Sequence, residues 1–148
     1  MTFVVPFDGT AESEAALERA SEIGGAMGEP VVAVTVVPTS DAAYARGKGW
    51  LEATEAFGLD TIVERVSAQV RDIAPDARFE CLESSREATS NSIAKPIRRF
   101  AKTSDASMVF IGSDNTGRLT TTLGSVGNRI STDRAYDVVI VRTHPPGR

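Results

Sequence analysis

One segment, from residue 112 to residue 129, is rich in the residue types that can bind phosphate. Glycine leaves backbone amides open to phosphate oxygens, and Ser and Arg side chains donate hydrogen bonds to them. The candidate ligand and turn residues here are Gly112, Asn115, Gly117, Arg118, Gly124, Ser125 and Val126. The segment is a candidate phosphate cradle, although the same residue types also build ordinary surface turns.

Apolar runs alternate with helix-periodic segments, and together they determine where this cradle lies. The expected strands are 3–7, 31–37, 78–82, 107–112 and 138–141, and the expected helices are 10–27, 59–73, 93–101 and 125–132. Continuous apolar runs are typical of strands buried on both faces. The alternation predicts an α/β fold, a doubly wound five-stranded parallel sheet with helices on both faces.

Three local features carry further expectations. Thr10 is the expected N-cap of the first helix, and Pro96 should lie in the first turn of the helix over 93–101. The segment 38–58 has no firm periodicity and is predicted as a loop, with one helical turn beginning at Trp50. Tyr44 and Trp50 could cover a bound base or simply pack this loop onto the sheet.

In open parallel sheets, ligands bind beyond the carboxyl ends of the strands, where the winding reverses. This rule selects four loops, which begin at Asp8 after the first strand, Pro38 after the second, Glu83 after the third and Gly112, in the cradle, after the fourth. Asp8 has two possible roles, which are to contact a ligand or to cap the first helix and brace its loop. Ser125 has a similar pair of roles, as phosphate donor and as cap of the last helix.

Composition excludes several classes of function. The 148 residues suit one domain over 1–148, and the net charge of -4 gives no field that would attract nucleic acid or an anionic membrane. No long apolar run predicts a membrane span, so a cytoplasmic location is expected. The single cysteine, Cys81, and the single histidine, His144, leave no zinc site, disulfide or His-based triad.

Four blocks in order give the chain a family resemblance. They are the opening Pro6-Phe7-Asp8-Gly9-Thr10, the segment 105–113, the block 123–130 and the closing segment 137–142. Together they resemble the universal stress protein domain over nearly the whole chain. The resemblance implies a Rossmann-like sheet, a homodimer formed through the last strand, and membership of a family that contains both ATP binders and non-binders.

The resemblance also implies a set of site residues. Gly112 matches the first glycine of the family's ATP motif, and Gly124-Ser125 matches its closing pair over the β- and γ-phosphates. Asp8 matches the acid at the nucleoside end, Val36 falls where a backbone group holds adenine, and Pro6 and Val126 flank these positions. Asn115 replaces the second glycine, and only eight residues separate it from Gly124 where the motif has nine. Gly117 lies off the family position, and Asp114 would repel a polyphosphate unless a cation such as Mg²⁺ bridged them.

Two functions follow, from different classes. The first is a stress or signalling module that binds ATP or another adenine nucleotide as an effector, with no catalytic residue and no metal-ligand set. The second is a nucleotide-independent, homodimeric interaction protein, which the shortened motif favours. Hydrolysis lacks a general base, and a dinucleotide oxidoreductase is disfavoured because Asp-Gly-Thr follows the first strand in place of Gly-x-Gly-x-x-Gly.

Overall fold

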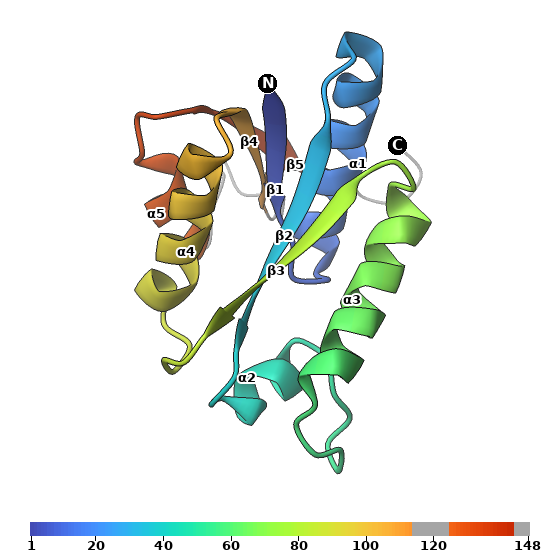
Figure 1. Cartoon of the computed structure of the whole chain (residues 1–148), viewed down its shortest axis with the longest axis vertical. Helices are drawn as coiled ribbons and strands as arrows, with labels where there is room; N and C mark the ends of the chain where they lie inside the picture. Colours follow the sequence, from blue (N-terminus) through green and yellow to red (C-terminus); the bar gives the residue numbers. More distant parts are fainter. Residues whose placement is uncertain (114–124, 144–148) are drawn as a thin grey trace.

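The computed structural model describes residues 1–113 and 125–143, which form a parallel sheet between two helical layers (Figure 1). The strands are β1 (Thr2–Pro6), β2 (Val31–Pro38), β3 (Arg78–Ser84), β4 (Ala106–Ser113) and β5 (Asp137–Arg142). The helices are α1 (Ala11–Met27), α2 (Ala42–Gly47), α3 (Leu59–Ile73), α4 (Ser90–Thr103) and α5 (Ser125–Ser131). Every expected strand and helix is present, with ends shifted by at most a few residues.

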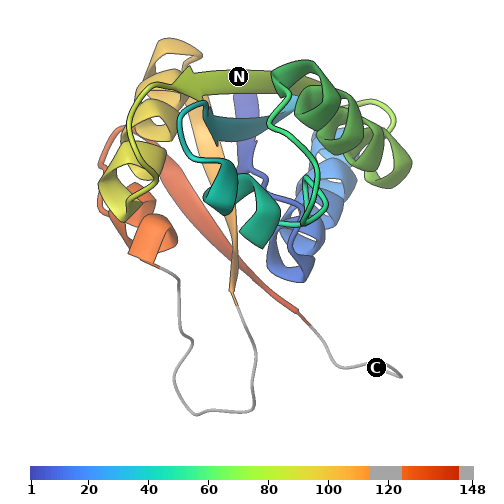
Figure 2. The same cartoon turned by 90° about the horizontal axis from the view of Figure 1, so that it is seen from below.

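The strand order is β3-β2-β1-β4-β5, and all neighbouring strands are parallel. The chain winds outward from β1 to β3, crosses back to β4 and continues to β5. Because parallel crossovers are right-handed, this reversal puts α1 and α3 on one face and α4 and α5 on the other. Figure 2 shows the two helix pairs separated by the sheet. The predicted doubly wound α/β fold is confirmed.

Each face of the sheet buries its own apolar cluster. Phe3 and Val5 of β1 pack with Leu17 on the α1 and α3 side, and Val4 packs with Ile97 on the α4 and α5 side. Successive residues of a strand point to opposite faces, so one short strand supplies both clusters. This two-sided burial is the reason that β2 is apolar except for Thr35, with every residue buried.

The helix starts confirm one expectation and overturn another. The Thr10 side chain accepts a hydrogen bond from the Ser13 N–H, so Thr10 is the N-cap of α1, as predicted. The expected place of Pro96 is wrong, because α4 begins at Ser90 and Pro96 lies in its second turn. Ser and Thr favour loops singly, but Thr89 and Ser92 form a reciprocal capping box that starts the helix early.

The helical turn expected at Trp50 is also wrong. The helix in this segment is α2, which begins after Asp41, whose carboxylate accepts a hydrogen bond from the Tyr44 N–H at 3.0 Å. Gly49 has a φ of 77°, a left-handed conformation that suits glycine and ends the helical path. Trp50 therefore follows the helix and turns inward, with 4% of its surface exposed.

Gly112 in β4 allows α1 to approach the sheet closely. A Cβ atom at this position would collide with the backbone carbonyl of Glu12, in the first turn of α1. Backbone cannot move aside as a flexible side chain can. The close approach of α1 to the end of β4 therefore requires glycine at position 112.

Gly112→Ala is expected to destabilise the protein by about 1–3 kcal/mol, because the added methyl group must displace α1 or β4. Gly25→Ala is the matched control, since a Cβ at this helical position meets no atom within 4 Å. That control should be neutral or stabilising by up to about 1 kcal/mol. Urea unfolding of both variants measures the difference, and equal stability of Gly112→Ala and wild type would contradict the close approach.

Candidate functional site

A cavity of about 560 Å³ opens beyond the carboxyl ends of β1 and β4, where the strand order reverses. This is the position at which doubly wound sheets bind ligands. Its apolar lining residues are Pro6, Phe7, Val34, Val36, Ile93, Ile97, Ile111, Val126 and Ile130. Its polar lining side chains are Asp8, Thr10, Glu12, Ser13, Tyr44, Lys48 and Ser125. The cavity therefore combines an apolar wall with a set of hydrogen-bonding and charged groups.

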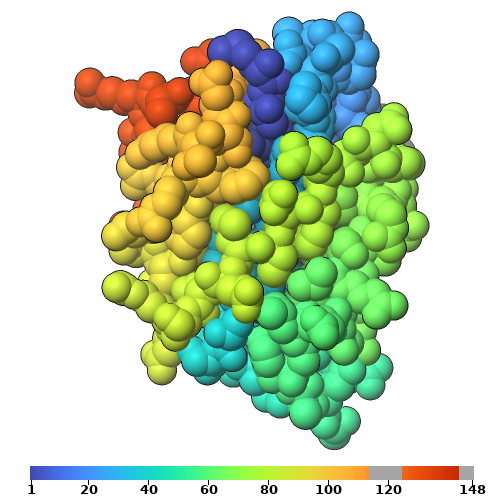
Figure 3. All heavy atoms as spheres, viewed as in Figure 1, coloured from blue at the N-terminus to red at the C-terminus, as the bar shows by residue number. Residues whose placement is uncertain are grey.

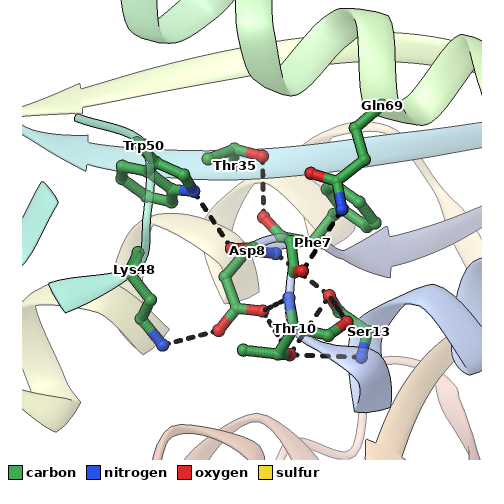
Figure 4. Close-up of polar contacts among 9 residues, drawn as sticks. Phe7, Asp8, Thr10, Ser13, Thr35, Lys48, Trp50 and Gln69 are labelled. Carbon is green, nitrogen blue, oxygen red and sulfur yellow. Dashed lines mark hydrogen bonds and ion pairs between the residues drawn. The ribbon is translucent and has the colours of Figure 1, made fainter. Parts of the chain in front are cut away.

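The Asp8 carboxylate is held by donors from two segments (Figure 4). Its Oδ1 accepts hydrogen bonds from the Thr10 N–H at 3.1 Å and the Thr10 hydroxyl at 2.6 Å. Its Oδ2 accepts one from Lys48 Nζ at 2.6 Å. Of the two roles expected for Asp8, these contacts are those of a brace between the β1–α1 loop and the segment after α2. Asp8 also lines the cavity, and its other expected role, contact with a ligand, remains a prediction.

The segment after α2 packs onto the β1–α1 loop through Trp50. The indole Nε1 donates a hydrogen bond to the Asp8 carbonyl at 3.0 Å, and the ring meets the Tyr44 ring edge-on with centroids 5.7 Å apart. Of the alternatives left open for these aromatic residues, packing is the one seen for Trp50. Tyr44 lines the cavity.

Helix α3 holds the same segment from the other side. Arg65 donates a hydrogen bond to the Trp50 carbonyl at 2.9 Å and forms a bidentate salt bridge with the Glu55 carboxylate, at 2.7 and 2.8 Å. The same helix also contacts the β1–α1 loop, because Gln69 Nε2 donates a hydrogen bond to the Gly9 carbonyl at 3.2 Å. Figure 4 shows the Gln69 side chain pointing toward this loop. These contacts join residues far apart in sequence, so the absence of periodicity in 38–58 did not imply an absence of order.

Lys48 is the site residue that sequence reasoning missed. It is the C-cap of α2, and its Nζ lies 5.5 Å from the centroid of the Tyr44 ring in addition to its contact with Asp8. No motif or spacing marks a single lysine between two glycines. Only the path of the chain after α2 brings this cation to the cavity.

The pKa values in this cluster follow from burial and pairing. Burial raises the pKa of the Asp8 carboxyl, but hydrogen bonds from Lys48 and Thr10 and the Lys48 charge outweigh it, so the pKa lies below its ordinary value. Burial lowers the pKa of Lys48, and the Asp8 hydrogen bond and charge raise it to a net increase. Burial is also the main cause of the raised pKa of Tyr44. At neutral pH the pair is therefore ionic and the phenol is protonated.

The predicted site residues divide into two groups. Those that line the cavity are Pro6, Asp8, Val36, Gly112, Ser125 and Val126. Those that lie outside the described residues are Asn115, Gly117, Arg118 and Gly124. The topology thus brings together predicted residues from four elements and one loop, and their role in binding stays a prediction.

Ser125 differs from its expected role as a helix cap. It is the first residue of α5, and its hydroxyl shares a hydrogen bond of 2.9 Å with the Ser90 hydroxyl at the start of α4. The two helix starts therefore meet beside the cavity. The Ser125 hydroxyl remains available as a donor if a ligand replaces Ser90 as its partner.

Among the described residues, no group of three or more His, Cys, Asp or Glu side chains could hold a metal ion. In the same part of the chain, no helix has both the length and the apolar character to cross a membrane.

A comparison with protein families settles the classification. The model of the universal stress protein family matches residues 1–142. This chain belongs to that family. A search of curated proteins found no match to this universal stress protein.

Solved structures of other universal stress proteins share its fold. One, crystallised in complex with cAMP, is 20% identical with a TM-score of 0.61, covering 97% of this chain and 98% of that one. One from Archaeoglobus fulgidus is 21% identical with a TM-score of 0.63, covering 95% and 93%. A structure from Archaeoglobus fulgidus in complex with dAMP is 18% identical with a TM-score of 0.60, covering 95% of each chain. At these identities the likeness shows the fold alone.

Lys48→Met is expected to destabilise the native state by about 1–2 kcal/mol at neutral pH, because Asp8 stays partly buried without its ion partner. In the wild type, the lowered Asp8 pKa contributes stability above about pH 4 that is lost as pH falls through the folded-state pKa. The variant should show a weaker acid dependence, because only the Thr10 hydrogen bonds then oppose the effect of burial on the Asp8 pKa.

Thermal unfolding between about pH 3 and pH 8 measures both effects. Lys48→Arg is the matched control, because it keeps a cation opposite Asp8 and should retain most of the stability. Identical pH profiles for Lys48→Met and wild type would show that the ion pair makes no net contribution.

Proposed function

We propose that this chain binds ATP or another adenine nucleotide in the cavity beyond β1 and β4, as an effector in a stress or signalling response. The observation that carries the proposal is the make-up of this cavity, which combines an apolar wall with charged and hydrogen-bonding side chains. Relatives of the same fold crystallised with cAMP and dAMP support the adenine class of ligand.

The backbone of Val36 is suited to hold the adenine edge. β1 ends at Pro6, in register with Val34, and the Phe7 N–H donates to the Val34 carbonyl at 2.8 Å. Alternate residues of a strand direct their backbone groups the same way, so the N–H and C=O of Val36 point past the end of β1. One donor and one acceptor match the amino group and ring nitrogen of adenine. The ring itself would lie against Ile93 and Ile97 of α4.

The rim supplies partners for the ribose and the phosphates. The Asp8 carboxylate is an acceptor for ribose hydroxyls, and Lys48 is a cation that could leave Asp8 for a phosphate oxygen. Ser125 donates from the start of α5. Gly112 contributes by keeping the end of β4 free of a side chain. The remaining proposed phosphate contacts come from Gly117, Arg118 and Gly124. Any Mg²⁺ would bind with the nucleotide through its phosphates.

The bound nucleotide is proposed to turn over slowly or not at all. A general base needs a pKa near the working pH. The pKa of Asp8 lies below its ordinary value, because burial is outweighed by the Lys48 and Thr10 hydrogen bonds and the Lys48 charge, which stabilise the carboxylate. Asp8 is therefore a weak base, which supports a binding role.

A second candidate is the nucleotide-independent interaction protein. The specific observation in its favour is that Asp8, Lys48 and Ser125 already have partners within the chain. Gly112 likewise has a packing role that needs no phosphate. Because these residues have contacts within the chain, their presence can be explained by folding alone, without a bound nucleotide.

Nucleotide binding separates the two candidates. ATP with magnesium at about 100 times its Kd should stabilise the wild type by roughly 2.7 kcal/mol in thermal melts. Ser125→Ala should raise the Kd about 5- to 30-fold, the loss of one hydrogen bond to a charged oxygen. Ser90→Ala is the matched control, because it removes the Ser90–Ser125 hydrogen bond yet keeps the Ser125 hydroxyl. If wild type shows no shift with millimolar ATP, AMP or cAMP, the interaction protein is the better account.

We infer that the chain also forms a two-fold homodimer through β5. Within the described residues β5 pairs with β4 alone, and its Ile140 is 45% exposed. The opposite edge strand, β3, carries Arg78, Glu80 and Glu83, and such charges oppose edge pairing. In β5 the charges, Asp137 and Arg142, lie only at the two ends, so its apolar middle is the edge suited to a second copy.

Ile140→Glu should convert the dimer to a monomer. The substitution puts a charge in the apolar contact, and the two-fold axis brings the two Glu side chains of the dimer close to each other, where they repel. Met27→Glu is the control, since Met27 is an exposed apolar residue at the end of α1. Light scattering at micromolar concentration distinguishes the states. A wild-type monomer, or a dimer that survives Ile140→Glu, would rule out this interface.

A further inference from the structure

The two helical layers of this molecule carry opposite charge. Helices α1 and α3 contain the acidic residues Glu12, Glu14, Glu18, Glu22, Asp60, Glu64 and Asp72 and the basic residues Arg19, Arg65 and Arg71. Helices α4 and α5 contain the basic residues Lys95, Arg98, Arg99, Lys102 and Arg129 and no acidic residue. The net charge of -4 thus conceals a polarised molecule, acidic on one face of the sheet and basic on the other.

The basic residues of α4 lie on its outer side. Ile93, Ile97 and Ala101 of this helix are buried against the sheet. The opposite side of the helix lines a shallow depression of about 560 Å³ with Asn91, Lys95, Arg98, Arg99, Lys102 and Thr103. We call this surface the α4 basic face. Helix α4 forms part of the outer surface of the molecule (Figure 3), and Lys95, Arg99 and Lys102 are exposed.

The α4 basic face already binds one carboxylate of its own chain. Oδ2 of Asp133, whose side chain is 7% exposed, lies 2.8 Å from Lys102 Nζ and 3.1 Å from Arg98 Nε. The hydrogen bond from Lys102, with further donors including Arg98, outweighs burial and lowers the pKa of Asp133 to about 2. These cations are therefore positioned to recognise carboxylates. Lys95 and Arg99 are exposed, and no ion pair between described residues involves either of them.

We propose that the α4 basic face is a docking surface for an acidic segment of a protein partner. Lys95 and Lys102 are about 10 Å apart along the helix, so a few extended residues of a partner cover the face. Carboxylates of that segment would pair with Lys95 and Arg99 and extend the arrangement already made with Asp133. The face lies on the side of α4 away from the nucleotide cavity, so the proposal does not depend on nucleotide binding.

A short acidic peptide fits this face better than a nucleic acid does. Nucleic-acid affinity grows with the number of phosphates neutralised, and tight binders make about 6–10 such contacts. Here two cations have no ion pair with any described residue, and two are engaged with Asp133. A long polyanion would also be repelled by the acidic residues of α1 and α3. A short segment interacts mainly with charges within a Debye length of about 8–10 Å.

The test measures binding of a fluorescent peptide of about eight residues with Glu at alternate positions, by anisotropy at low salt. Wild type should bind it, binding should weaken as salt rises, and the same peptide with Gln in place of Glu should not bind. The double variant Lys95→Glu/Arg99→Glu should bind about tenfold more weakly or worse. Arg19→Glu/Arg71→Glu is the matched control, because it makes the same change in net charge on α1 and α3, and it should bind as wild type does.

Several outcomes would overturn the proposal. These are no binding by wild type, equal binding of the Gln peptide, or an equal loss in both double variants. Tighter binding of a single-stranded oligonucleotide or of anionic vesicles than of the Glu peptide would also reject an acidic protein segment as the partner. Circular dichroism and an unchanged midpoint of thermal unfolding for Lys95→Glu/Arg99→Glu establish that any loss does not come from unfolding.

Discussion

The reversal of winding at β1 is the constraint on which the rest of this structure depends. β1 lies between β2 and β4, and right-handed crossovers on its two sides must use opposite faces of the sheet. The helices therefore diverge at this point, and their divergence leaves the cavity beyond the strand ends. Gly112 belongs to the same constraint, because α1 can cross the end of β4 only where no side chain stands between them.

Asp8 connects this constraint to the chemistry of the site. Its carboxylate joins the start of α1, through Thr10, to the segment after α2, through Lys48. Its backbone carbonyl accepts a hydrogen bond from the Trp50 indole, and Arg65 of α3 donates to the backbone carbonyl of Trp50. The rim of the cavity is thus a network that stabilises the fold. A ligand that engages Asp8 or Lys48 has to exchange contacts within this network, so binding and stability are coupled at this position.

Helix α4 has different surroundings on its two sides, and both follow from one amphipathic sequence. Its apolar side completes the core and part of the cavity wall, and its outer side is basic along its length. The reciprocal cap at Thr89 and Ser92 starts the helix early enough to bring Ser90 beside Ser125. One element therefore contributes to packing, to the candidate nucleotide site and to the exposed charge of the molecule.

The order and type of the main elements were determined by the sequence itself, because burial on both faces produces continuous apolar runs and amphipathic helices repeat at 3.6 residues. The same patterns located the candidate site, since the carboxyl ends of parallel strands share one edge. Only the tertiary structure decided three other features, which are the Lys48–Asp8 pair, the inward turn of Trp50 and the packing role of Gly112. Each joins segments distant in sequence, where the contact depends on the path of the chain through space and leaves no local periodicity to read.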